Sequence, residues 1–164
     1  MTLRNKLVTL LVLAVAWNCL FSVPVDALAV TLPFGSSTEL LEAVDTYLSV
    51  DPDEQAVLEV IGQYGLMESW DVSRITDFSS VFSRERNPNV VQLHADLSLW
   101  DVSNSQTFAN MFHGARSVDF DVSTWDVSNA KNFSRMFDSA SSFQGRGLAL
   151  WDVSNGQEIG RAHV

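Results

Sequence analysis

The sequence predicts an α/β solenoid of stacked units of about 25 residues, preceded by a helical N-terminal cap. The tetrapeptide Trp-Asp-Val-Ser occurs four times, beginning at positions 70, 100, 125 and 151. The spacings are 30, 25 and 26 residues, and a period of this length is typical of stacked repeats. A helix-like apolar pattern follows the first three tetrapeptides, and a short alternating segment precedes the last three.

The apolar pattern after each Trp predicts one short helix per unit. Apolar residues stand 8, 11, 12 and 15 positions after Trp, with Glu85 as the exception at the last offset in the first unit. These offsets describe one face of a helix. A helix this short is only marginally stable in isolation, and stacking on the next unit must therefore stabilise it. The predicted structural positions are Trp70, Trp100, Trp125, Trp151, Asp71, Asp101, Asp126, Asp152, Phe78, Phe82, Phe108, Met111, Phe112, Phe133, Met136 and Phe137.

The segment before each Trp predicts one short strand per unit. Leu97, Val122 and Leu148 stand three residues before a Trp, and the run alternates through the Val of the tetrapeptide. One strand and one helix per unit is the leucine-rich-repeat type of coil. The Ser of each tetrapeptide is expected to cap the helix, with Ser103 and Gln106 as a capping box.

Residues 1–29 are predicted to be a signal peptide. Arg4 and Lys6 precede a largely apolar run over 7–16, and Ala27-Leu28-Ala29 provides a cleavage site. The protein would then be secreted, or exposed at the cell surface. A retained signal anchor is the alternative, since 7–23 reaches the shortest length that spans a bilayer. The single Cys, Cys19, lies in this segment, so no disulfide is expected after cleavage.

Residues 30–69 are predicted to be a helical cap for the repeats. Ser36 and Glu39 form a capping box, and Leu40 and Val44 follow at helical spacing. Asp51-Pro52-Asp53 separates this helix from a second one that runs to Gly62. Their acidic outer faces suit the terminal unit of a solenoid.

Two other segments depart from the repeat. The first unit carries a charged insertion at 84–89, expected to be a surface bulge, or alternatively part of a binding face. The fourth unit, from 151, stops after about seven residues. Residues 158–164 are similar to an in-frame translation of a common sequencing adapter, so we expect the repeat region 70–157 to be truncated and 158–164 to be an artefact.

The repeat resembles that of the BspA-like leucine-rich-repeat surface proteins. The resemblance covers 70 to about 157 and rests on Trp-Asp-Val-Ser, then Met-Phe and Ala at a 25-residue period. Similar repeats occur in mycoplasma surface lipoproteins and in secreted proteins of unicellular algae. The resemblance implies adhesion or surface recognition, and it supplies no catalytic residues.

The composition argues against several kinds of chemistry. A net charge of −10 disfavours nucleic acid and anionic membranes as partners. The histidines are His94, His113 and His163, and no Gly-rich phosphate loop occurs. No enzyme activity, cofactor or resident metal is therefore expected.

The repeated Asp residues, the repeated Trp residues and one sequon each allow a functional as well as a structural interpretation. Asp71, Asp101, Asp126 and Asp152 could together bind Ca²⁺, although capping of a turn is favoured. The Trp residues could form a carbohydrate-binding platform, although burial is favoured. Asn132 begins the single Asn-x-Ser sequon and is a possible N-glycosylation site.

The predicted function is extracellular recognition or adhesion, with an unidentified extracellular protein or glycan as partner. The alternative is a structural component of a cell wall or matrix, and a carbohydrate-binding module is less favoured. No membrane contact is expected after signal removal.

Overall fold

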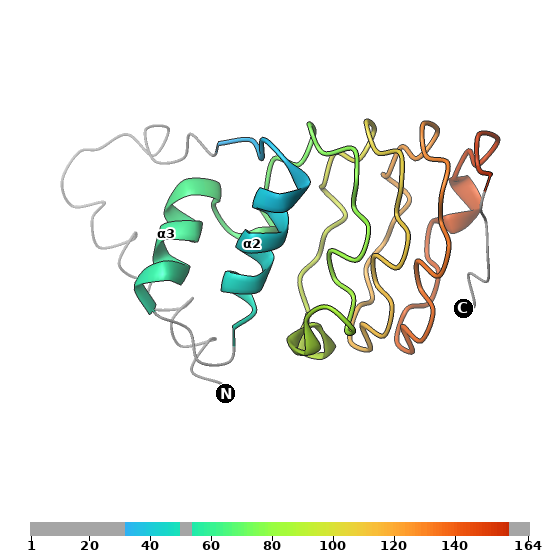
Figure 1. Cartoon of the computed structure of the whole chain (residues 1–164). Coiled ribbons are helices and arrows are strands. Elements are labelled where there is room, and N and C mark those ends of the chain that lie inside the picture. Colours follow the sequence, from blue (N-terminus) through green and yellow to red (C-terminus); the bar gives the residue numbers. More distant parts are fainter. Residues whose placement is uncertain (1–31, 50–53, 158–164) are drawn as a thin grey trace, which may run out of the picture. The chain divides into compact units, whose positions relative to one another are not determined.

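The computed structural model describes residues 32–49 and 54–157, in which regular elements are few (Figure 1). Helix α2 spans Ser37–Tyr47 and helix α3 spans Glu54–Tyr64. The 3-10 helices η2, η3 and η4 follow at Met67–Ser69, Pro88–Gln92 and Leu148–Leu150. None of these described helices has the length and apolar character needed to span a membrane. The predicted signal peptide and the segment 158–164 lie outside the described residues.

Helix α2 begins where the capping box predicts. Ser36 is the N-cap, and its Oγ accepts a hydrogen bond from the Glu39 backbone N–H at 3.2 Å. The Glu39 carboxylate accepts in turn from the Gly35 N–H at 2.6 Å, one residue earlier than a standard capping box. Leu40 and Val44 are fully buried. The helix therefore presents its apolar face to the core.

Helix α3 continues past Gly62 to Tyr64, and Gly65 follows with a positive φ of 80°. Tyr64 stacks on Phe34, with ring centroids 4.0 Å apart, and its hydroxyl donates to a carboxylate oxygen of Glu39 in α2. Burial, followed by this hydrogen bond, raises the pKa of Tyr64 from 10.0 to about 12. The same hydrogen bond is the main cause of the lowered pKa of Glu39.

The raised pKa of Tyr64 predicts a loss of stability at high pH. From pH 10 to about 12 the unfolded chain ionises Tyr64 while the folded chain keeps its proton, so the free energy of unfolding falls as pH rises. A rise in pKa from 10.0 to about 12 corresponds to about 3 kcal/mol. Urea unfolding at pH 9 and pH 12 should show that Tyr64→Phe lacks this part of the decline. An equal decline in both proteins would contradict it.

The repeats do not form the predicted α/β solenoid. We define unit 1 as 70–99, unit 2 as 100–124 and unit 3 as 125–150, and unit 4 begins at 151. The segments expected to be helices are irregular turns. The physical reason is the backbone at the tenth position after Trp, where Ser80, Asn110 and Arg135 have φ of 61°, 56° and 55°. A left-handed residue interrupts the hydrogen bonds of a right-handed helix.

The expected strands are also absent, and no sheet occurs in the described residues. Isolated parallel bridges join Asp77 to Thr107 and Thr107 to Asn132. In unit 3 the segment before Trp151 is the 3-10 helix η4. The predicted capping box at Ser103 is wrong because no helix follows, and the Ser103 N–H donates to Asp101 instead.

Backbone hydrogen bonds between units replace those of helices and sheets. In unit 1 every second N–H from Phe78 to Arg84 donates to a carbonyl of unit 2. In unit 2 every second N–H from Phe108 to Gly114 donates to a carbonyl of unit 3 at 2.8 Å. The intervening N–H groups of Met111 and His113 bond within their own unit. Consecutive units therefore lie side by side as coils (Figure 1).

The core lies inside these coils and consists of stacked columns of aromatic rings. Phe112 stacks on Phe82 and on Phe137, each with centroids 5.5 Å apart. Phe108 stacks in the same way between the equivalent residues of units 1 and 3. The Phe and Met residues at the fixed offsets after Trp are at most 4 % exposed. The repeated offsets thus mark buried residues, although the backbone between them is not helical.

The insertion of unit 1 completes the N-terminal side of this stack. Unit 1 follows no earlier unit, so other groups must satisfy the carbonyls that would accept from one. The Asp77 carbonyl accepts from Ser37 Oγ of α2 at 2.7 Å, and the Val81 carbonyl accepts from Arg86 Nη2. Arg86 also donates through Nη1 to both carboxylate oxygens of Asp45 in α2, each at 2.6 Å. The insertion lies at the surface, as expected, but Arg86 also bonds it to α2.

At the C-terminal side of the stack, the hydrogen bonding predicts that amides of unit 3 exchange faster with solvent than the equivalent amides of unit 2. The N–H groups of Phe108 and Phe112 donate to unit 3, whereas no described residue accepts from the equivalent N–H groups of Phe133 and Phe137. Because exchange requires an exposed or opened amide, Phe133 and Phe137 should exchange faster. Hydrogen exchange with residue resolution measures this difference. Equal protection of both pairs would contradict the expectation and require acceptors beyond residue 157.

Candidate functional site

Three of the four tetrapeptide Trp residues donate an indole hydrogen bond to the carbonyl three residues before the preceding Trp. The indole N–H of Trp100 donates to the Met67 carbonyl at 2.8 Å, and that of Trp125 donates to the Leu97 carbonyl at 3.0 Å. The indole N–H of Trp151 donates in the same way to the carbonyl of Val122, which stands three residues before Trp125. Trp70, Trp100 and Trp125 are at most 3 % exposed. These three rings therefore belong to the core and offer no platform for a sugar.

The Asp of each tetrapeptide closes a turn. In every unit its Oδ1 accepts from the backbone N–H of the Ser two residues later, at 3.0–3.1 Å. Hydrogen bonds from the Ser128 hydroxyl and N–H lower the pKa of Asp126. Those from the Ser154 N–H and hydroxyl lower the pKa of Asp152. Within the described ranges no group of three or more His, Cys, Asp or Glu side chains is placed to hold a metal ion.

This geometry predicts that calcium does not stabilise the protein. Each Asp of the tetrapeptide already uses one carboxylate oxygen to accept the N–H of its turn, whereas Ca²⁺ requires six to eight oxygen ligands. Tight binding to the folded state would raise the melting temperature. Thermal unfolding with millimolar CaCl₂ or with EDTA should give the same midpoint. A calcium-dependent increase that disappears in Asp101→Asn would overturn this prediction.

Each unit contains further turns of the same kind that the sequence analysis missed. Four residues before Trp, Asp96 and Asp121 accept from the N–H groups of Ser98 and Ser123. Seven residues after Trp, Asn132 Oδ1 accepts from the Ser134 N–H at 2.9 Å. Asn132 is partly exposed, and its glycosylation stays a prediction.

A repeated Asn also joins the units and was missed. The side-chain amides of Asn104, Asn129 and Asn155 donate to the carbonyl of the tetrapeptide Ser in the preceding unit, at 2.7–2.8 Å. The sequence signal is an Asn directly after Trp-Asp-Val-Ser in units 2, 3 and 4. Unit 1 has Arg74 at this position, where no earlier unit is present to accept the bond.

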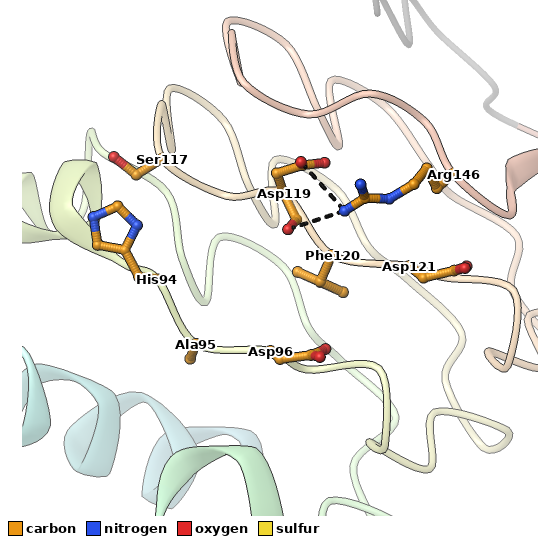
Figure 2. Close-up of a pocket in the computed structure, with 8 residues that line it drawn as sticks. All are labelled: His94, Ala95, Asp96, Ser117, Asp119, Phe120, Asp121 and Arg146. Atoms are coloured by element: carbon orange, nitrogen blue, oxygen red, sulfur yellow. Dashed lines mark hydrogen bonds and ion pairs between the residues drawn. The ribbon is translucent and has the colours of Figure 1, made fainter.

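The candidate site is a surface hollow of about 530 Å³, which we call the three-unit hollow (Figure 2). Units 1 and 2 contribute residues four to six positions before the next Trp, and unit 3 contributes Arg146, five positions before Trp151. Phe120 lies at the base, where its ring packs against Phe112 and Trp125. The hollow is lined by His94, Ala95, Asp96, Ser117, Asp119, Phe120, Asp121 and Arg146.

The three-unit hollow is acidic. Its one guanidinium, Arg146, is paired with Asp119, with Nη2 3.2 Å from Oδ2 (Figure 2). Asp96 and Asp121 are exposed, and each uses Oδ1 to accept a turn N–H. The hydrogen bond from the Ser123 N–H is the largest cause of the lowered pKa of Asp121, with Arg146 a smaller one. Two unpaired carboxylates therefore face solvent at the hollow.

Gly147 allows unit 3 to approach unit 2 beside this hollow. Its φ is 89°, and a Cβ added there would lie 2.2 Å from the Ser123 backbone nitrogen. Only glycine combines this conformation with so close a contact. The close approach places the neighbouring Arg146 within reach of Asp119.

The predicted structural residues and the hollow are separate. None of the Trp, Asp, Phe and Met positions predicted from the repeat lines the hollow. A sequence signal for it did exist, since Asp-x-Ser recurs four residues before Trp100 and Trp125. Asp119 and Arg146 could not be found in this way, because the residue types at their positions differ between units.

Comparison with known proteins identifies a family. No curated protein and no solved structure matches the chain. A family model described as "Mycoplasma protein of unknown function, DUF285" matches residues 56–162, which include most of helix α3 and all of the described repeats. The match covers more than half of the chain, and the chain therefore belongs to this family.

Proposed function

We propose that the chain is a secreted or cell-surface recognition protein that binds a basic segment of an extracellular protein at the three-unit hollow. The observation that carries this proposal is that three consecutive units contribute polar side chains to one hollow, as in repeat proteins that bind across their units. The Trp-Asp-Val-Ser period supports a closer relationship to BspA-like surface proteins, for which adhesion is the expected role.

The charges favour a basic partner. Asp96 and Asp121 are exposed and have no cationic side chain within ion-pair distance among the described residues. Arg146 is already neutralised by Asp119. A Lys or Arg side chain entering the hollow would gain a charge-assisted hydrogen bond. The net charge of −10 would also speed the approach of such a segment.

A matched pair of double variants tests the hollow. Asp96→Asn with Asp121→Asn keeps the oxygen that accepts the turn N–H but removes both charges from the hollow. Asp101→Asn with Asp126→Asn makes the same change in equivalent turns outside it. We expect a fluorescent lysine-rich peptide to bind the first variant about tenfold more weakly than the parent, a change of about 1.4 kcal/mol. Equal losses in both variants would mean that only net charge matters.

Secretion is tested separately. Expression of the full chain in a secreting host should release a protein whose N-terminus is Val30. Retention of residues 1–29 in a membrane fraction would favour the signal anchor. In the native organism, recovery only from wall material that resists salt and detergent would replace recognition by a structural role.

A further inference from the structure

We propose that a second hollow, of about 430 Å³, binds a ligand that carries a single oxyanion group, such as the carboxylate of an acidic sugar or a phosphate. This hollow, which we call the cationic hollow, is lined by Arg84, Glu85, Pro88, His113, Gly114, Arg116 and Ser139. It draws on units 1, 2 and 3, but it shares no residue with the three-unit hollow.

The two arginines are the basis of the assignment. Arg86 and Arg146 are held in ion pairs, whereas no described carboxylate lies within ion-pair distance of Arg84 or Arg116. In a chain with net charge −10, two unpaired guanidinium groups in one hollow are an unusual concentration of positive charge. Guanidinium groups bind carboxylate and phosphate oxygens through paired hydrogen bonds.

Glu85 provides the one carboxylate that lines this hollow, and it lies near His113 and outside ion-pair distance of the arginines. Glu85 Oε1 lies 3.8 Å from Nδ1 of His113, and Asp138 Oδ2 lies 3.7 Å from Nε2 on the other side of the same ring. His113 is largely buried, and its Nδ1 has no hydrogen-bond partner in the described part of the chain. The imidazole between the two carboxylates thus forms a polar wall next to the arginines.

Gly114 leaves room for the Arg84 side chain. With φ of 70°, Gly114 has a backbone conformation that side chains rarely adopt, and an added Cβ would lie 3.0 Å from Cβ of Arg84. The Arg84 backbone N–H is bonded to the His113 carbonyl at 2.8 Å. The backbone that carries Arg84 is therefore fixed, while its exposed guanidinium is free to meet a ligand.

The charge balance favours a ligand with one anionic group over a polyanion. Among the residues that line the hollow, two arginines stand against one glutamate, and Asp138 lies beyond the His113 ring. The acidic remainder of the protein repels a chain of many phosphates or sulfates over the Debye length of about 8 Å at physiological salt. A ligand with a single oxyanion group gains the local contacts and meets less of this repulsion.

The test uses the full chain and small probes. Methyl glucuronide and inorganic phosphate supply the two kinds of oxyanion, and methyl glucoside is the neutral control. NMR titration at low salt should give saturable shifts of the Gly114 amide and the Arg84 and Arg116 side chains. We expect a dissociation constant on the order of 1 mM, which weakens as salt is added. Saturation by only one probe would identify the kind of oxyanion.

Matched variants separate local contacts from net charge. Arg84→Gln with Arg116→Gln should weaken binding at least about tenfold, because both charge-assisted contacts are lost. Arg74→Gln with Arg135→Gln removes the same charge at exposed positions outside the hollow and should change binding little. The proposal is overturned if neither probe saturates, if methyl glucoside binds equally well, or if both double variants weaken binding to the same extent.

Discussion

Replacing Phe112 with alanine is expected to lower the free energy of unfolding by about 3–5 kcal/mol. The Phe112 side chain is fully buried, and it stacks between Phe82 and Phe137 with interplanar angles of 5° and 7°. Its ring also packs edge-on against Phe120 at 5.7 Å. Truncation would therefore leave a cavity that borders all three units, and the hydrogen-bonded coils can close little of it.

Urea unfolding would measure this loss as a lower midpoint with an unchanged slope. The control is Leu99→Ala, because Leu99 is 81 % exposed and its loss should change stability by less than about 0.5 kcal/mol. Phe112→Leu should fall between the two. A Phe112→Ala protein as stable as the Leu99→Ala protein would disprove the stacked core.

Replacing Arg86 with alanine is expected to destabilise the protein by about 3 kcal/mol. The change removes the ion pair with Asp45 and the donors to the Ser80 and Val81 carbonyls. Charge-assisted hydrogen bonds contribute about 1.5–3 kcal/mol each, and an unsatisfied buried acceptor adds a penalty of about 1–3 kcal/mol. Partial exposure of Asp45 reduces the total, because solvent screens the ion pair.

A double-mutant cycle isolates the contact between Arg86 and Asp45. Asp45→Ala alone should cost less than Arg86→Ala, because the bonds from Arg86 to unit 1 remain. Arg74→Ala is the control for the loss of an exposed arginine. If Arg86→Ala destabilises no more than Arg74→Ala, the insertion does not hold α2 against the repeats.

The sequence was sufficient to find the buried residues but not the backbone between them. Phe and Met recur at helical offsets, and a turn that brings residues 8, 11 and 12 positions after Trp into one core gives the same pattern as a helix. The deciding feature is the left-handed residue ten positions after Trp. Only Asn110 is of a type that favours this conformation, whereas Ser80 and Arg135 carry no such signal.

Contacts between residues close in the sequence were easier to predict than contacts between residues far apart in it. Ser36 and Glu39 lie three residues apart, so their capping interaction was visible in the sequence. Arg86 and Asp45 are 41 residues apart, and their pairing depends on how α2 lies against unit 1. Similarly, the recurrence of Asp96 and Asp121 could be found, but the hollow that they line exists only once three coils are stacked.

The one-way hydrogen bonding between coils has a consequence for the length of such proteins. From Phe78 to Arg84, and again from Phe108 to Gly114, each coil offers donors on one side and acceptors on the other. A duplicated copy of 100–124 inserted after 124 would meet the same partners on both sides, and it would leave the contacts of α2 and Arg86 untouched. Gene duplication can therefore lengthen this array by inserting units between its two ends. Each inserted unit would add a surface hollow, and neither end would need to change.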